Sequence, residues 1–170
     1  DNICLKGEDI GEGDVVLSKG ERITPAHIAV LATVGCTRPQ VYAQPRVAIL
    51  ATGSELVEPT GKADGARIRN SNSDQLAAQL RQMGVIVNRC GIIPDTLEAT
   101  VTAIDAARKD HDLVMISGGV SMGDYDFVPA ALQKNGFEFR FKSVAMQPGR
   151  PTIFGRCGET YCFGLPGNPV

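Results

Sequence analysis

The feature that most constrains this fold is an alternation of strand-like and helix-like segments that begins at residue 46. Arg46–Ala51 is a continuous apolar run, which is typical of a strand covered on both faces, and Val85–Ile93 and Leu113–Ser117 are further strand candidates. Ser73–Met83 and Leu97–Arg108 carry apolar residues at helical spacing. Because this alternation places helices on both faces of a mostly parallel sheet, we predict a three-layer α/β/α domain over residues 46–170.

The last part of the chain extends this pattern. A helix is predicted over Phe127–Asn135, where Gly136 ends it. Strands are predicted over Phe137–Val144, Thr152–Cys157 and Thr160–Gly164. Because these strands are too closely spaced for helical crossovers, we expect them to add an antiparallel edge and make the sheet mixed.

Residues 1–45 differ from the rest and are predicted to form a small α+β arm that leads into the α/β domain. The glycines at positions 7, 11, 13 and 20 indicate short strands joined by tight turns. After them a helix is predicted, with Thr24 as N-cap, Pro25 at the first helical position and Gly35 at its end.

Composition narrows the class of protein. Of the 170 residues, 43% are hydrophobic, enough for a full core, and the formal net charge of −2 leaves no basic stripe for nucleic acid. The longest apolar runs are far shorter than the roughly 20 residues of a membrane span, and no signal peptide opens the sequence. The five cysteines form no CxxC pair, and Cys90 and Cys162 are predicted to be buried, reduced thiols. We therefore expect a soluble, cytoplasmic protein.

Three predicted strands each end close to an acidic residue. Glu55 follows the first strand within the run Thr52-Gly53-Ser54-Glu55, Asp95 follows the second, and Asp126 follows the third. One such acid is commonly a turn residue or helix cap. Because ligands of open α/β sheets bind outside the carboxyl ends of the strands, three acids at successive strand ends predict a shared site.

The segment Gly118-Gly119-Val120-Ser121-Met122-Gly123 is the sharpest local signal. Gly118, Gly119 and Gly123 permit backbone angles at which successive N–H groups surround an anion, and the Ser121 hydroxyl adds a donor. The segment matches neither the P-loop nor the dinucleotide-binding fingerprint. It is therefore interpreted as a phosphate nest, with a tight strand-to-helix turn as the alternative.

Two more loops are rich in proline and glycine, Gln147-Pro148-Gly149-Arg150-Pro151 and Gly164-Leu165-Pro166-Gly167-Asn168-Pro169. Paired prolines stiffen a loop and leave its N–H groups available to a ligand. The Arg150 guanidinium is a fork of donors suited to an oxyanion. Structural turns are the alternative interpretation for both loops.

Six motifs occur together in one order: ATGSEL (51–56), IRNSNSDQL (68–76), GIIPDT (91–96), SGGVSMGDYD (117–126), QPGRP (147–151) and GLPGNPV (164–170). This series resembles the molybdopterin molybdenumtransferase family, which includes MoeA and the gephyrin E domain. The segment GEDI…TPAHIAVLATVG…VYAQPRVAIL is similar to the part that precedes the family's active-site domain. The resemblance implies a MogA-like molybdopterin-binding fold for residues 46–170, C-terminally truncated, from a longer chain.

The resemblance also implies a function. Family members insert molybdenum from molybdate into adenylylated molybdopterin and release AMP, with a divalent cation such as Mg²⁺, in the last step of molybdenum cofactor biosynthesis. By motif, Asp126 would hold the cation, with Glu55, Asp95 and Asp9 as further catalytic acids. The ligand-binding residues implied by the motifs are Thr52, Gly53, Ser71, Asn72, Gly118, Gly119, Ser121, Gly123, Pro148, Gly149, Arg150, Gly167 and Asn168.

The sequence departs from the family pattern at two places. Asn70 stands where members often have aspartate, and Gln147 stands where many have lysine. The resemblance further implies a homodimer in which Asp9 approaches the partner's site, and contact with the molybdopterin adenylyltransferase. A fragment of this kind is expected to turn over poorly alone. Three alternatives remain at this stage: a molybdopterin adenylyltransferase, a CinA-type nucleotide pyrophosphatase and a non-catalytic gephyrin-like scaffold.

Overall fold

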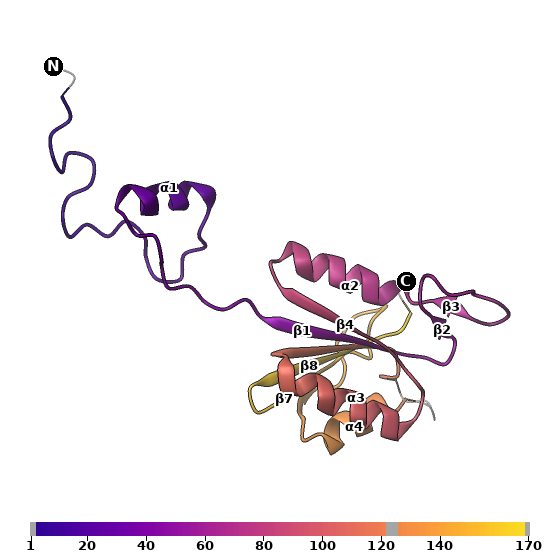
Figure 1. The fold of residues 1–170 in the computed structure, drawn as a ribbon. Helices are drawn as coiled ribbons and strands as arrows, with labels where there is room; N and C mark the ends of the chain where they lie inside the picture. The colour runs from indigo at the N-terminus through magenta and orange to yellow at the C-terminus, as the bar shows by residue number, and fades with distance from the viewer. Residues whose placement is uncertain (1–2, 122–125, 169–170) are drawn as a thin grey trace. The chain divides into compact units, whose positions relative to one another are not determined.

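The computed structural model describes residues 3–121 and 126–168. The chain divides into two compact units, Asp1–Ala43 and Gln44–Val170 (Figure 1). None of the helices described is long and apolar enough to cross a membrane.

Within residues 3–43, the first unit contains one helix, α1 (Pro25–Thr33). It begins as predicted: the Thr24 side chain accepts a hydrogen bond from the His27 N–H at 3.4 Å, and the His27 ring accepts one from the Thr24 N–H at 3.3 Å. The short strands expected around the early glycines are absent from residues 3–43. Backbone hydrogen bonds there close local turns, such as Glu8 N–H to Leu5 O, because no neighbouring strand is available for pairing.

The second unit is built on a six-stranded sheet. In spatial order its strands are β4 (Ile86–Ile93), β1 (Arg46–Thr52), β5 (Leu113–Ser117), β8 (Thr160–Leu165), β7 (Ile153–Cys157) and β6 (Glu138–Phe141). The first four are parallel, whereas β7 runs antiparallel to both its neighbours. The predicted mixed sheet is therefore confirmed.

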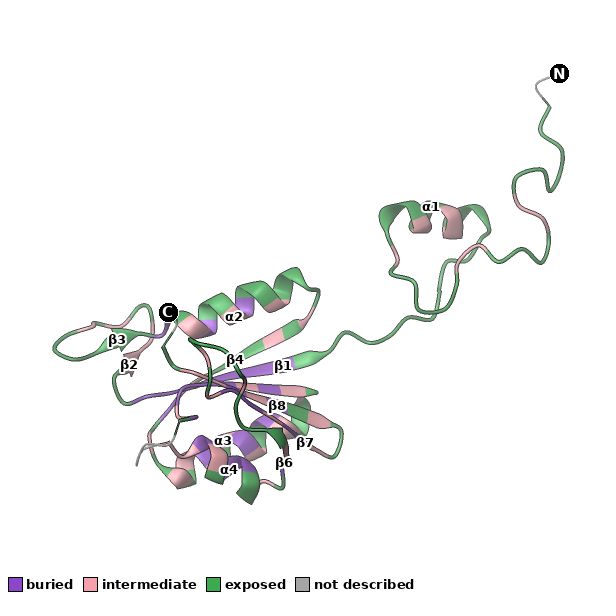
Figure 2. Cartoon of the chain, turned by 180° about the vertical axis from the view of Figure 1, so that it is seen from behind, coloured by how far each residue is buried: buried purple, intermediate pink, exposed green. Residues whose placement is uncertain are grey.

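Helices cover both faces of this sheet. Helix α2 (Ser71–Gln82) lies on one face, and α3 (Leu97–Asp110) and α4 (Val128–Lys134) lie on the other (Figure 1). The buried strand β1, purple in Figure 2, contributes side chains to the core on each face of the sheet. Val47 and Ile49 pack with Ala77 of α2. Leu50 belongs to the larger core beneath α3 and α4.

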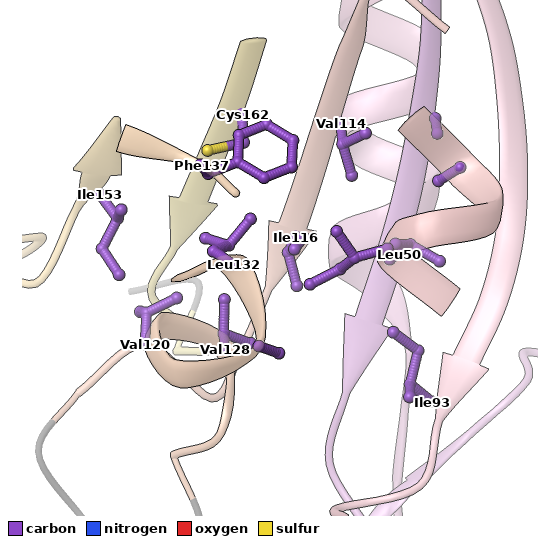
Figure 3. Packing of buried hydrophobic residues seen from close by; sticks show 14 residues of the cluster. Leu50, Ile93, Val114, Ile116, Val120, Val128, Leu132, Phe137, Ile153 and Cys162 are labelled. Atoms are coloured by element: carbon purple, nitrogen blue, oxygen red, sulfur yellow. The ribbon is translucent and has the colours of Figure 1, made fainter. Parts of the chain in front are cut away.

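The larger core lies between the sheet and helices α3 and α4, which are drawn below the sheet in Figure 1. Figure 3 shows Val128 and Leu132 of α4 beside Ile116 of β5, and all three are fully buried. Cys162 is buried in the same core, as predicted, and this burial raises the pKa of its thiol to about 12. The prediction that Cys90 is buried is wrong, because β4 forms an edge of the sheet and leaves this thiol exposed.

Elements with a clear periodicity lie close to their predicted ranges. Helix α2 begins two residues earlier than predicted because Asn70 caps it, its side-chain oxygen accepting from the Ser73 N–H at 3.2 Å. Two strands were not predicted: β2 (Leu56–Val57) and β3 (Ile68–Arg69), which pair with each other in parallel. Two residues are too few to show the period-two alternation by which a strand is identified.

The order of the strands fixes where a ligand can bind. Strand β1 lies between β4 and β5 in the sheet. The chain leaves β1 through α2 toward β4, whereas it leaves β5 through α4 toward β6, β7 and β8. The connections that leave β1 and β5 therefore go to opposite sides. Such a switch point opens a crevice at the carboxyl ends of the two strands.

Candidate active site

A cleft of about 720 Å³ lies at this switch point. Its walls come from the carboxyl ends of β1, β4 and β5, from the start of α2, and from the chain that leaves β8. Segments far apart in the sequence thus meet at one edge of the sheet, as the three strand-end acids predict.

The three acids all line this cleft. The Asp95 carboxylate oxygen Oδ2 accepts hydrogen bonds from the Ser54 N–H at 2.6 Å and from the Ser54 hydroxyl at 2.7 Å. Asp95 therefore ties the loop after β4 to the loop after β1. Glu55 is exposed, with its carboxylate beside Gly53, and Asp126 is half-buried just before α4.

These acids do not form a ready-made metal cage. Within residues 3–121 and 126–168, no group of three histidine, cysteine, aspartate or glutamate side chains is close enough to hold a metal ion. Mg²⁺ commonly keeps several waters and is held by one or two carboxylates together with substrate phosphates. An arrangement with separate rim acids therefore suits a cation that arrives with its phosphate ligand.

The glycine loop lies against β1. Gly118 and Gly119 have φ angles of +93° and +62°, and a Cβ atom on Gly119 would lie 2.7 Å from the Thr52 hydroxyl oxygen. The Gly118 N–H donates to the Leu165 carbonyl at 3.0 Å. The prediction that this N–H binds an anion is therefore wrong for Gly118. Ser121 lines the cleft, whereas Gly123 lies outside the described residues.

The Thr52 hydroxyl oxygen is buried beneath the glycine loop without a hydrogen-bond partner. Thr52 and Gly53 both line the cleft, as expected. An unpaired buried hydroxyl costs about 1–3 kcal/mol. A ligand with a hydrogen-bonding group at this point of the cleft would satisfy it.

The start of α2 forms the opposite wall. Ser71 and Asn72 line the cleft as predicted, as do Gly167 and Asn168. The Asn72 amide nitrogen donates to the Ser117 hydroxyl and to the Gly167 carbonyl, each at 2.8 Å. Both of its N–H groups are thus used to hold α2, β5 and the last loop together, and Asn72 is a positioning residue for the cleft.

The Gln147–Pro151 loop does not line this cleft apart from Pro151. Pro148, Gly149 and Arg150 line a second hollow of about 970 Å³ formed by residues 143–151. The loop connects β6 and β7, which lie beyond β8 and away from β1. Pro151 lines both spaces, so that they adjoin.

Asp9 belongs to the first unit and is exposed there. The expected approach of Asp9 to a partner's site therefore stays a prediction.

Sequence reasoning missed several residues of the cleft wall, among them Arg69, Asn70 and Ser117. Arg69 is the only cationic side chain among the described residues that line the cleft. The signal was present in the run IRNSNS, since Arg69 and Asn70 directly precede two residues that were assigned to the site. Ser117 could not be distinguished from an ordinary last residue of a buried strand.

Comparisons with known proteins agree with this geometry. Residues 48–170 match the family described as "Probable molybdopterin binding domain", and residues 1–35 match "MoeA N-terminal region (domain I and II)". A protein from Staphylococcus epidermidis named molybdopterin molybdenumtransferase is 42% identical over 169 residues, which are 99% of this chain and 40% of that protein.

Solved structures show the same likeness. The crystal structure of a molybdopterin biosynthesis MoeA protein from Pyrococcus horikoshii has a TM-score of 0.82 and 32% identity, covering 96% of this chain and 40% of that one. A MogA structure shares the fold alone, with a TM-score of 0.53 and 19% identity over 73% of this chain. The chain thus spans about 40% of the length of its curated relatives.

Proposed function

The chain belongs to the family of probable molybdopterin-binding domains, and from this premise we propose that it is the substrate-holding part of a molybdopterin molybdenumtransferase. The reaction proposed is insertion of molybdenum from molybdate into adenylylated molybdopterin, with release of AMP. The observation that carries the proposal is the meeting of three rim acids, the glycine loop and the Gly167–Asn168 segment around one cleft.

The cleft fits a phosphate-bearing substrate in two respects. Gly118 and Gly119 let the glycine loop pack directly on Thr52, at a place where a side chain would collide with it. The unpaired Thr52 hydroxyl beneath the loop is a hydrogen-bonding group proposed to serve the ligand. Gly119 and Ser121 then hold the phosphate against β5, with Gly123 proposed as a further member of the loop.

The rim acids are proposed to act on the side of the phosphate that faces away from the glycine loop. A carboxylate about 4 Å from a phosphate repels it by roughly 4 kcal/mol at an effective dielectric of 20. Bound Mg²⁺ would reverse that interaction and neutralise charge on the phosphoanhydride oxygens. Asp126 is the residue proposed to hold the cation, with Glu55 as a further acid of the same cleft, whereas Asp95 orients the loop through Ser54.

Molybdate is proposed to approach from the second hollow. Arg150 lines this hollow and offers a planar fork of donors to a tetrahedral oxyanion. Pro151 lines both spaces, so an oxyanion held by the loop lies next to the cleft. Gln147 adds hydrogen-bonding capacity but no charge, so Arg150 is assigned the electrostatic part.

The arm supports a molybdenumtransferase over an adenylyltransferase or a pyrophosphatase. Residues 1–35 match the MoeA N-terminal region, and the MoeA structure covers 96% of the chain where the MogA structure covers 73%. We extend the proposal to a cytoplasmic homodimer in which Asp9 completes the partner's cleft, and to contact with the adenylyltransferase that supplies the substrate. Five free cysteines agree with a reducing compartment.

The test uses Asp126→Asn in the full-length protein, with Asp110→Asn as a control at the far end of α3. We expect Asp126→Asn to depress molybdenum insertion and AMP release far more than binding of adenylylated molybdopterin. Asp110→Asn should change neither. Wild-type turnover of Asp126→Asn at limiting Mg²⁺ would contradict the assignment and pass the role to Glu55 or Asp95.

A further inference from the structure

We infer that the wall formed by Arg69, Asn70 and Ser71 is a second oxyanion subsite, across the cleft from the glycine loop. This inference deepens the proposed function, because it names how the same cleft holds a second group of its ligand. The chemistry is that of a tetrahedral oxyanion, either a phosphate of the substrate or molybdate itself.

Asn70 gives the strongest indication. Its side chain is 2% exposed, and its oxygen caps α2 by accepting from the Ser73 N–H. This bond fixes the orientation of the amide, because a flipped amide would turn a donor toward that N–H. The nitrogen Nδ2 is left buried without a partner on a residue that lines the cleft. Since Nδ2 only donates, its missing partner is an acceptor such as an anionic oxygen.

The start of helix α2 adds two more donors. The Ser71 and Asn72 N–H groups lie in the first turn of a helix of 12 residues, where no intrahelical acceptor exists. The N-terminal end of such a helix also carries a partial positive charge. Asn72 presents only its backbone N–H here, because its side-chain amide is used on Ser117 and Gly167.

Arg69 supplies the charge. Its Nε donates to the Pro59 carbonyl at 3.1 Å, which orients the guanidinium and leaves the Nη groups for other acceptors. Arg69 forms no ion pair within the described parts of the chain. A cation that lines a cleft and pairs with none of the described carboxylates is suited to a ligand anion.

Two acids near this wall share one arginine of the protein. Glu58 follows β2, and Asp74 lies in the first turn of α2. Both carboxylates bind Arg89 of β4, at 2.8 and 2.9 Å. Of the three rim acids, Asp95 and Asp126 lie at other strand ends. Glu55 is closer, because its carbonyl accepts from the Ile68 N–H next to Arg69, and its exposed carboxylate lies beside Gly53.

Arg69→Gln tests the inference, with Arg81→Gln as a charge-matched control in the last turn of α2. AMP, inorganic phosphate and sodium molybdate are titrated separately into the 170-residue chain by calorimetry, without Mg²⁺ and at one ionic strength. We expect Arg69→Gln to weaken the binding of one of these anions at least tenfold, whereas Arg81→Gln changes the affinity for that anion by less than twofold. If the binding of AMP and phosphate is lost, a phosphate group is the occupant. If only the binding of molybdate is lost, molybdate is the occupant.

Asn70→Asp is the second variant, because aspartate retains the cap but loses the Nδ2 donor. It should melt within a few degrees of the wild type and still bind the same anion at least tenfold more weakly. Equal affinities in Arg69→Gln and Arg81→Gln would overturn the inference, as would unchanged binding by Asn70→Asp. The proposed function is judged separately by molybdenum insertion in the full-length protein, which can fail while anion binding through Arg69 persists.

Discussion

Replacing Gly118 with alanine tests whether close backbone approach holds the glycine loop against β1. Gly118 has a φ angle of +93°, and a Cβ there would overlap the Thr52 carbonyl oxygen and lie 3.0 Å from its hydroxyl oxygen. A left-handed backbone costs an L-residue roughly 1–2 kcal/mol. Overpacking against a fixed backbone atom adds about 1–3 kcal/mol. We expect Gly118→Ala to lower the free energy of unfolding by about 2–5 kcal/mol.

Gly91→Ala is the matched control. Gly91 lies in β4 with a φ angle of +88°, but a Cβ there would meet nothing within 4 Å. This variant therefore carries the backbone cost of roughly 1–2 kcal/mol without the overlap. The difference between the two variants isolates the steric contact with Thr52.

Urea and thermal unfolding followed by circular dichroism provide the measurement. The two variants should differ in unfolding free energy by about 1–3 kcal/mol. In a domain of this size, each kcal/mol shifts Tm by about 2–4 °C. Gly118→Ala should also weaken AMP binding, because the Gly118 N–H fixes the last loop through the Leu165 carbonyl. If Gly118→Ala proves no less stable than Gly91→Ala, the loop does not depend on close packing against β1.

Two further predictions concern residues around the cleft and in the core. Asn72→Ala removes two hydrogen bonds that join α2, β5 and the last loop, so we expect about 1–3 kcal/mol lower stability and faster amide exchange at Gly167, measured by NMR. Cys162 should resist thiol reagents at pH 8 while exposed Cys4 reacts. Burial raises the Cys162 pKa from 9.0 to about 12, so the thiol ionises more easily in the unfolded chain than in the folded protein. The contribution of the neutral thiol to folding stability is therefore complete below pH 9 and is lost as pH rises from 9 toward 12. Urea titrations should therefore show a smaller alkaline loss of stability in Cys162→Ala than in the wild type.

The parts of the fold that could be predicted depend on local patterns. Strand β5 has its predicted bounds, Leu113–Ser117, because a buried strand needs a short apolar run and little else. Helix α1 begins after Thr24 because a capping side chain and a following proline are both local signals. The common position of the three rim acids was also predictable, since parallel strands bring their carboxyl ends to one edge.

Residues whose contacts depend on a distant partner were only partly predictable. Asn72 lines the cleft as predicted, but its side-chain amide donates to residues 45 and 95 positions away in the chain. Pro148 and Gly149 were expected in the main cleft, but their loop follows β6, which the sheet order places at the far edge. Cys90 lies in an apolar run whose exposure is decided by the edge position of β4.

The sequence by itself determined the α/β alternation, the helix boundaries to within about two residues, and the edge of the sheet at which the site residues gather. Each of these follows from the burial of one element's own side chains, which is written in the spacing of its residues. Only the tertiary structure decided that Arg69 lines the cleft without an ion pair among the described residues and that the Asn70 amide is left with an unpaired donor. Whether a polar group is paired depends on atoms brought near it by folding, and no local spacing encodes which atoms those are.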